Sequence, residues 1–251
     1  MSEKLKKADQ YNDPSFNYMS YWDGRQYEHR AEVMAINRLL RGKHFKKAVD
    51  IGGGYGRLTS LLCDFADSVT LAEPSQQQLD LAKKHLADYP DIMRKLMQAD
   101  KLEFADSSVD LIMMVRVMHH LPDPRPELKE IRRVLTDDGV AIIEVANYMH
   151  ARNRIKHFIS RQPFPTEPVD IRTNKNQSDS LPFVNHNPYT VMKQLKEAGL
   201  KVDRILSVSN LRSPTLKKLL PASAMLAFEG VLQPTLSKTF FGPSVFFLVK
   251  K

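Results

Sequence analysis

The sequence predicts an α/β protein built on a parallel β-sheet with helices on both faces. Two observations predict it. Between residues 46 and 146, short apolar segments alternate with amphipathic ones, which is the rhythm of repeated strand–helix units. Within that region, residues 109–116 (VDLIMMVR) form a nearly continuous apolar run, as expected for a strand covered on both faces.

The individual elements follow from the same patterns. In the first 146 residues we expect helices at 26–40, 57–65, 76–86 and 125–135, and strands at 47–51, 68–72, 93–98, 109–116 and 140–145. Asp138-Gly139 is expected to mark the end of the last of these helices.

The strand–helix rhythm breaks after Ala146. We expect a helix at 148–160, a loop at 172–180, a helix at 189–198 and strands at 201–207 and 244–249. Prolines 214, 221 and 234 restrict residues 211–241 to short helices. The chain is therefore divided into an N-terminal helical cover (1–45), a core (46–146), an inserted lid (147–188), and a part that completes the sheet (189–251) with a helical insertion at 211–241.

Charge is distributed unevenly along the chain. The net charge is +8, but residues 1–146 hold 21 Lys and Arg against 23 Asp and Glu, whereas residues 147–251 hold 16 against 6. A positive field of this kind favours an acidic small molecule, a phospholipid surface or nucleic acid, and it is also compatible with a solvated basic surface.

Other features of the composition restrict the class of protein. A single cysteine, Cys63, excludes an internal disulfide and a cysteine-based metal cluster. The sequence has no apolar run of membrane-spanning length and no apolar signal-peptide segment near its start, so we expect a soluble cytoplasmic protein.

A glycine-rich turn is the first candidate for ligand binding. In residues 48–59 (AVDIGGGYGRLT), a strand leads through Gly52, Gly53, Gly54 and Gly56 into a predicted helix. Glycine lets a ligand lie directly on the backbone, and the helix N-terminus directs N–H groups toward it. About twenty residues later Glu73, followed by Pro74, ends the next strand, where a carboxylate can accept both hydroxyls of a ribose. These two features fit a dinucleotide or S-adenosylmethionine equally well.

The third feature distinguishes between them. Residues 98–145 contain Asp100, Leu102–Phe104, Val109-Asp110-Leu111, the run VMHHLPDP (117–124), Arg133-Val134-Leu135 and Asp138-Gly139. In these motifs residues 46–146 closely resemble class I S-adenosylmethionine-dependent methyltransferases of the type 11 group, which includes ubiquinone and menaquinone biosynthetic enzymes. The resemblance implies a Rossmann-like, seven-stranded, mostly parallel sheet whose last strand is antiparallel, with a helical lid. It also implies S-adenosylmethionine as cofactor and S-adenosylhomocysteine as product.

The same resemblance assigns roles to individual residues. Asp50 and the turn glycines Gly52, Gly53, Gly54 and Gly56 are implied to line the methionine and ribose side. Glu73 is implied to bind the ribose hydroxyls, Asp100 and the backbone at Lys101 the adenine amine, and Val115 and Arg116 to border the methionyl group. The set of candidate cofactor-binding residues also includes Arg57, Pro74, Leu102, Tyr18 and Arg25.

Three of these assignments have alternatives. Arg57 could meet the cofactor carboxylate or lie on the helix surface. Arg116 could clamp a carboxylate or form an internal ion pair. The N-terminal aromatic residues could close over the sulfonium or simply anchor a helix on the sheet; they are Tyr11, Phe16, Tyr18, Tyr21 and Trp22.

Methyl transfer from a sulfonium requires alignment of the reactants, and a general base only where the acceptor arrives protonated. His119 and His120 are the candidate catalytic residues, and they could instead serve the structure of their loop. No cluster of Asp, Glu and His residues suggests a metal site.

For the acceptor we expect a small molecule, anionic or lipid-like. Basic residues within 148–166 could clamp an anion or form a solvated helix face. Residues 211–241 could rest on an anionic membrane or pack over the substrate cleft. Two alternatives remain: an RNA methyltransferase, which the absence of a recognisable RNA-binding module disfavours, and a non-catalytic cofactor-binding protein.

Overall fold

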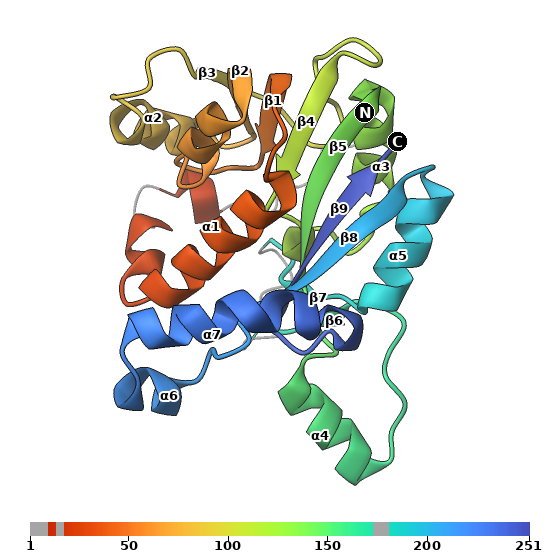
Figure 1. Ribbon diagram of the computed structural model, residues 1–251. Helices are drawn as coiled ribbons and strands as arrows, with labels where there is room; N and C mark the ends of the chain where they lie inside the picture. Colours follow the sequence, from red (N-terminus) through yellow and green to blue (C-terminus); the bar gives the residue numbers. More distant parts are fainter. Residues whose placement is uncertain (1–9, 14–17, 173–180) are drawn as a thin grey trace.

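The computed structural model describes residues 10–13, 18–172 and 181–251. Its centre is a seven-stranded sheet with the order β3-β2-β1-β4-β5-β9-β8 (Figure 1). The strands are β1 (Phe45–Ile51), β2 (Ala66–Glu73), β3 (Met93–Leu96), β4 (Val109–Met114), β5 (Leu135–Ala146), β8 (Lys201–Val208) and β9 (Ser244–Lys250). Strands β1 to β5 pair in parallel, while β9 runs antiparallel to both β5 and β8. The predicted mostly parallel sheet with an antiparallel last strand is confirmed.

Helices cover both faces of the sheet because its central strands are apolar on both sides. In β5, Val140 and Ile142 face a core shared with α1 (Gln26–Leu40) and α2 (Gln76–His85). Ala141 and Ile143 face the opposite core, shared with α3 (Arg125–Val134) and α5 (Pro188–Glu197). Every residue of this alternating set is at most 2% exposed, so the sheet is buried from both sides.

Three local predictions differ from the structure. The helix expected at 57–65 is a 3₁₀ segment, η3 (Thr59–Asp64), because successive N–H groups bond three residues back, as from Thr59 to Gly56. Asp138-Gly139 does not end a helix: α3 ends at Val134, and the pair lies within β5. Helix α7 (Ala222–Thr235) is longer than expected, since Pro234 is its penultimate residue and interrupts only its last turn.

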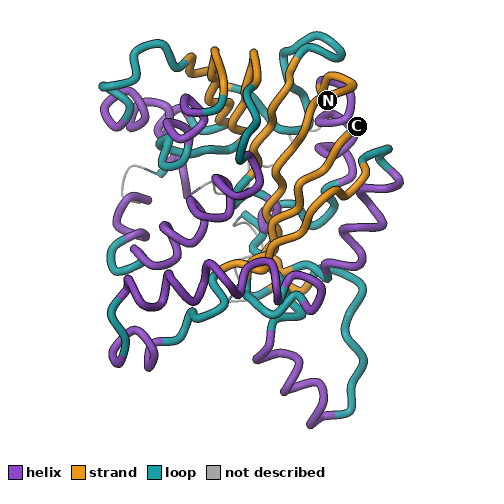
Figure 2. The backbone as a smooth tube through the Cα atoms, in the orientation of Figure 1, coloured by secondary structure: helices purple, strands orange, loops and turns teal. Residues whose placement is uncertain are grey.

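The segments inserted into the second half lie mainly at one end of the molecule. Helix α4 (Ala151–Ser160) projects from the body, and α6 (Pro214–Leu219) and α7 lie at the same end (Figures 1 and 2). Strands β6 (Val169–Asp170) and β7 (Val184–Asn185) pair with each other in antiparallel orientation. Apart from Arg172, the loop predicted at 172–180 lies outside the described residues, as does Phe16. Within the described part of the chain, no helix combines the length and apolarity needed to cross a membrane.

Candidate functional site

The glycine turn follows directly from β1 and presents bare backbone. Gly52 and Gly54 have φ angles of +65° and +59°, which favour glycine. Gly53 has no room for a side chain, because a Cβ there would lie 2.3 Å from Asp50 Oδ2. Gly56 packs against Leu86, which a Cβ would approach to 2.6 Å. A Cβ at Gly52 would likewise lie 2.5 Å from Val117, and one at Gly54 would meet Tyr18 at 3.5 Å, so the whole turn is closely packed.

Asp50 lies beneath this turn, almost fully buried, and accepts a hydrogen bond from Thr59 Oγ1 at 2.6 Å. Burial raises the pKa of this carboxyl to about 7, although the Thr59 hydroxyl and Arg57 act in the opposite direction. Asp50 also lines a small hollow together with Gly52, Gly53 and Val115. A cation entering this hollow would favour the ionised carboxylate.

Glu73 closes the adjacent end of β2. Its Oε2 accepts from the backbone N–H of Gly54 at 2.9 Å, and its Oε1 accepts from that of Ser75 at 3.0 Å. Ser75 caps α2, since its hydroxyl accepts from the N–H of Gln78. The carboxylate is thus held in one orientation between the glycine turn and the start of α2.

A cavity of about 950 Å³ opens over these groups. Its lining includes Gly52, Gly54 and Glu73, and also Tyr11, His120, Leu121 and Leu181. The remaining lining residues come from the N-terminal cover, β1, the loop after β3 and the loop after β4; they are Asn12, Tyr18, Ile51, Pro74, Ser75, Gln78, Met97, Gln98, Ala99, Asp100, Arg116, Val117 and Glu127. A volume of this size suits a cofactor together with a small acceptor.

Gln78 tests whether a nucleoside fits this cavity. It is fully buried and lines the cavity, yet both atoms of its amide lack a hydrogen-bond partner. A buried amide without partners is costly, so such a group indicates a missing ligand or water. Together with the carboxylate of Glu73 and the backbone of Gly52 and Gly54, which line the same cavity, this amide offers the donor and acceptor groups that a ribose requires. The residues present therefore fit the adenosyl group expected from the sequence.

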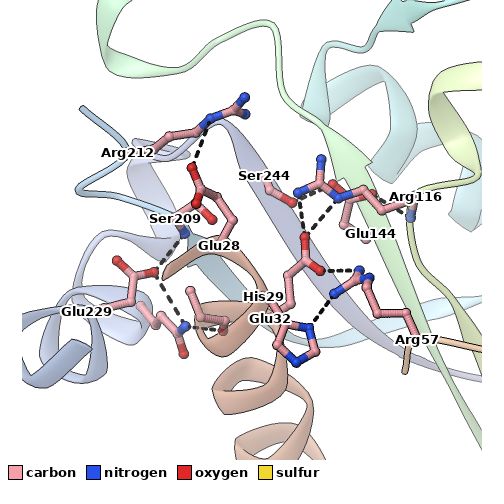
Figure 3. A network of polar contacts seen from close by, with 12 residues as sticks. Glu28, His29, Glu32, Arg57, Arg116, Glu144, Ser209, Arg212, Glu229 and Ser244 are labelled. Carbon is pink, nitrogen blue, oxygen red and sulfur yellow. Dashed lines mark hydrogen bonds and ion pairs between the residues drawn. The ribbon is translucent and has the colours of Figure 1, made fainter. Parts of the chain in front are cut away.

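A buried ion cluster connects the cover to the turn (Figure 3). Glu32 of α1 is fully buried and accepts from Arg57 Nη2 at 2.6 Å and from Arg116 at 2.5 and 2.8 Å. Burial alone would raise the pKa of Glu32, but the two arginines hold it below its ordinary value. The guanidinium of Arg57 also stacks on Trp22, 3.4 Å from the ring centroid. Of the two alternatives for Arg116, the structure therefore shows the internal ion pair. Arg57 belongs to the same cluster, because it pairs with the same carboxylate of Glu32.

Arg116 has an unusual backbone as well. Its φ of +65° is rare for a residue with a side chain, and it lies directly after β4 and Val115. Its N–H donates to Glu144 Oε2 at 3.0 Å, and Ser244 Oγ donates to the other oxygen of that carboxylate. The strained conformation turns the guanidinium toward α1 and leaves the backbone of the β4 loop facing the glycine turn.

The two candidate histidines have different surroundings. His119 is buried against the rings of His120 and Phe183, and burial lowers its pKa well below the ordinary value. His120 lines the cavity; its Nδ1 donates to the carbonyl of Pro182 at 2.8 Å, and its Nε2 lies 2.9 Å from the hydroxyl of Tyr11. His120 therefore joins the N-terminal cover to the loop that precedes β7.

The remaining predicted residues lie at various distances from the cavity. Tyr18, Pro74 and Asp100 line it. Leu102 is buried in the core, and its N–H donates to Glu130, while the Lys101 side chain is exposed. Arg25 stacks on Tyr21 at 3.9 Å and does not line the cavity.

Gln78, which lines the cavity, and Glu32, which pairs with Arg57 and Arg116 behind it, were not among the predicted site residues. Gln78 had a local signal, because Ser75-x-x-Gln78 is a helix N-terminal pattern that fixes which residues begin α2. Glu32 had none, since its partners Arg57 and Arg116 lie 25 and 84 residues away in sequence.

Comparison with known proteins agrees with this geometry. Residues 49–143 match a family model described as a methyltransferase domain. An uncharacterized methyltransferase of Mycobacterium tuberculosis is 29% identical over 94 residues, which are 38% of this chain and 37% of that protein. A ubiquinone biosynthesis O-methyltransferase of Parvibaculum lavamentivorans is 28% identical over 111 residues, 44% of each protein. The chain thus matches less than half the length of these relatives.

The fold extends beyond that matched region. A solved structure of a methyltransferase of Leishmania major, named as S-adenosylmethionine-dependent, superposes with a TM-score of 0.64 at 16% identity and covers 96% of this chain and 80% of its own. The sheet order, the glycine turn and the family match agree with one another. Residues 49–143 thus match a methyltransferase domain, and the fold of the chain is the one found in solved S-adenosylmethionine-dependent methyltransferases.

Proposed function

We propose that this protein transfers a methyl group from S-adenosylmethionine to a small, largely apolar and lipid-like acceptor. One observation carries the proposal: the glycine turn and Glu73 share a single cavity with Tyr11, His120, Leu121 and Leu181. A cofactor held by the glycine turn and Glu73 would leave the part of the cavity beside His120, Leu121 and Leu181 for an acceptor.

The residues of the chain would bind and orient the reactants. Bound S-adenosylmethionine supplies an electrophilic methyl group on a positively charged sulfur. Glu73 and Gln78 would bind the ribose, Asp100 the adenine amine, and the backbone of Gly52 and Gly54 the methionyl side. The N-terminal cover (1–45) would exclude water, which strengthens these polar contacts.

The charges that line the cavity favour an uncharged acceptor over an anionic one. The lining contains three carboxylates, Glu73, Asp100 and Glu127, and its one arginine is Arg116, which already pairs with Glu32. An anionic acceptor would meet no uncommitted arginine or lysine among the described lining residues, whereas Leu121, Leu181 and Met97 offer apolar contacts. The same carboxylates favour a cofactor that carries positive charge.

His120 is the candidate general base for an acceptor that arrives as a hydroxyl or a protonated amine. It lines the cavity, and the Pro182 carbonyl fixes the proton on Nδ1, which leaves Nε2 as the basic atom. Nε2 accepts from the Tyr11 hydroxyl in this structure, so an acceptor would have to replace that hydroxyl. His119 is a weaker candidate, because it is buried outside the cavity lining.

The test is an assay with methyl-labelled S-adenosylmethionine and separate lipid and polar extracts of the source cell. We expect a labelled product in the lipid extract, identified by its mass shift, and much less product from Glu73→Gln at a low concentration of S-adenosylmethionine. A labelled product only in the polar or RNA fraction would contradict the lipid-like acceptor. Binding of S-adenosylhomocysteine without a labelled product in any fraction would contradict catalysis.

A further inference from the structure

Helix α4 exposes an apolar stripe that no part of the described structure covers. Ile155, Phe158 and Ile159 are 62%, 85% and 75% exposed. Their spacing of three and four residues places them on one face of the helix. Single exposed apolar side chains are common on protein surfaces, but three on one face of a ten-residue helix form a contiguous patch.

The opposite side of α4 holds the helix in place. Asn153 donates to the carbonyl of Tyr148 at 2.7 Å, and Arg154 donates to the carbonyls of Met149 and Thr239. The ring of His157, the one buried residue of the helix, stacks on Phe164 with 4.5 Å between ring centroids. The orientation of the exposed stripe therefore does not depend on the stripe itself.

Positive charge surrounds the stripe. Arg152, Lys156 and Arg161 are exposed and form no ion pair within the described residues, and residues 148–166 contain no Asp or Glu. Part of the basic excess of the second half thus lies beside these apolar side chains and outside the cavity lining. Lys and Arg can extend their charged ends to lipid headgroups while an adjacent apolar face enters the bilayer boundary.

We propose that α4 is an interfacial anchor that lies in the headgroup region of an anionic lipid membrane. A projecting convex helix with basic flanks suits a flat anionic surface, whereas a protein partner would have to supply a groove with acidic edges. The membrane contact expected at 211–241 is only a secondary part of this surface. Leu216, Leu220 and Leu226 pack inward around Tyr27, whereas Leu219, Phe228 and Val231 remain exposed. Helices α6 and α7 lie at the end of the molecule where α4 projects (Figure 1).

The test is co-sedimentation of the full chain with vesicles of phosphatidylcholine alone and of phosphatidylcholine mixed with phosphatidylglycerol. We expect retention on the mixed vesicles that weakens with added salt, because the attraction is partly electrostatic. Arg152→Gln with Lys156→Gln should weaken retention more than tenfold, and Phe158→Ser with Ile159→Ser should abolish it. Matched controls are Lys84→Gln with Lys129→Gln, which removes two exposed lysines elsewhere, and Leu96→Ser, which removes an apolar side chain that is 56% exposed on β3.

Two outcomes would overturn the proposal. One is equal retention on both kinds of vesicle, or none on either. The other is a concentration-dependent dimer in light scattering that Phe158→Ser with Ile159→Ser dissociates, since this would assign the stripe to a second copy of the chain. Binding of S-adenosylhomocysteine should be unchanged in the α4 variants, and this shows that they are folded. The inference is independent of the acceptor, so failure of the labelling assay would leave it standing.

Discussion

The two halves of the molecule use charge in opposite ways. In residues 1–146 acidic and basic residues nearly balance, and the decisive ones are buried: Glu32 between two arginines, and Glu73 between two backbone N–H groups. In residues 147–251 basic residues outnumber acidic ones by ten, and Arg152, Lys156 and Lys218 among them are exposed.

The comparison shows that net charge identifies a partner only once its location is known. From the sequence, the basic second half suggested an acidic small molecule, a phospholipid surface or nucleic acid as partner, or else a solvated surface. In the structure the cavity walls are acidic and the basic residues of α4 lie outside them. All but one of the described cavity-lining residues belong to the first half, Leu181 being the exception, whereas the exposed apolar and basic residues of α4 belong to the second half. The following experiments test this division, from the largest expected effect to the smallest.

Replacing Glu32 by Gln should destabilise the protein most. The change leaves two buried guanidiniums with a single neutral amide, and loss of one partner in a buried ion pair typically costs about 3–5 kcal/mol. Urea unfolding measures the effect. Asp106→Asn is the control, because Asp106 pairs with Arg133 but is 77% exposed, and it should cost no more than about 1 kcal/mol. Equal losses in the two variants would show that the buried cluster contributes no more than a surface pair.

Replacing Glu73 by Gln should weaken the binding of S-adenosylhomocysteine by about 10- to 100-fold, since a hydrogen bond to a charged group contributes about 1.5–3 kcal/mol. Glutamine keeps one acceptor for the N–H groups of Gly54 and Ser75, so the turn should persist. Isothermal titration calorimetry measures the affinity. Glu103→Gln, the same change at an exposed carboxylate outside the cavity lining, should leave it unaltered. Unchanged affinity in Glu73→Gln would remove this residue from the ribose site.

Most of the fold could be predicted because its signals are local. The helix expected at 26–40 has those bounds in the structure, and each predicted strand is present, since apolar periodicity needs only neighbouring residues. The 3₁₀ geometry of η3 could not be predicted. It accompanies a contact between Thr59 and buried Asp50, and sequence pattern does not encode such contacts.

The same distinction applies to the site. The glycine turn and Glu73 were recognisable because the carboxyl ends of adjacent parallel strands meet at one edge of the sheet, so motifs at strand ends converge. Tyr11 and His120 are 109 residues apart, and no spacing rule brings them together. The exposure of α4 depends on what the rest of the chain leaves uncovered, and only the three-dimensional structure shows this.

The buried carboxyl of Asp50 predicts that the free energy of unfolding depends on pH. Its pKa is about 7 in the folded protein and near the ordinary value of about 3.9 when unfolded. Between these values the folded state binds the extra proton, so this group's contribution to stability is present at low pH and decreases by about 1.4 kcal/mol per pH unit as the pH rises from 4 toward 7. His119 and His186, whose pKa values are lowered by burial, contribute the opposite slope.

Asp50→Asn isolates that contribution, because the amide oxygen can still accept from Thr59. Urea unfolding of both proteins between pH 4 and 7 should give a stability difference that shifts toward the variant as pH rises. A pH-independent difference would show that Asp50 titrates near its ordinary value.

The smallest expected effect concerns the contact between the cover and the loop after β4. Tyr11→Phe removes the hydroxyl that lies 2.9 Å from His120 Nε2, and a hydrogen bond of this kind contributes about 1 kcal/mol. If the cover closes over the cofactor, this loss should weaken the binding of S-adenosylhomocysteine by about fivefold. Fluorescence of Trp22, the single tryptophan, reports the binding from within the cover itself.

The control is Tyr21→Phe, which removes a hydroxyl from the same segment. Among the described residues no hydrogen bond of the Tyr21 hydroxyl is found, so this change should leave the affinity unchanged. Equal affinities in all three proteins would mean that the cover packs on the core without helping to hold the cofactor, and the ligand chemistry of the first half would then reside in residues 46–146 alone.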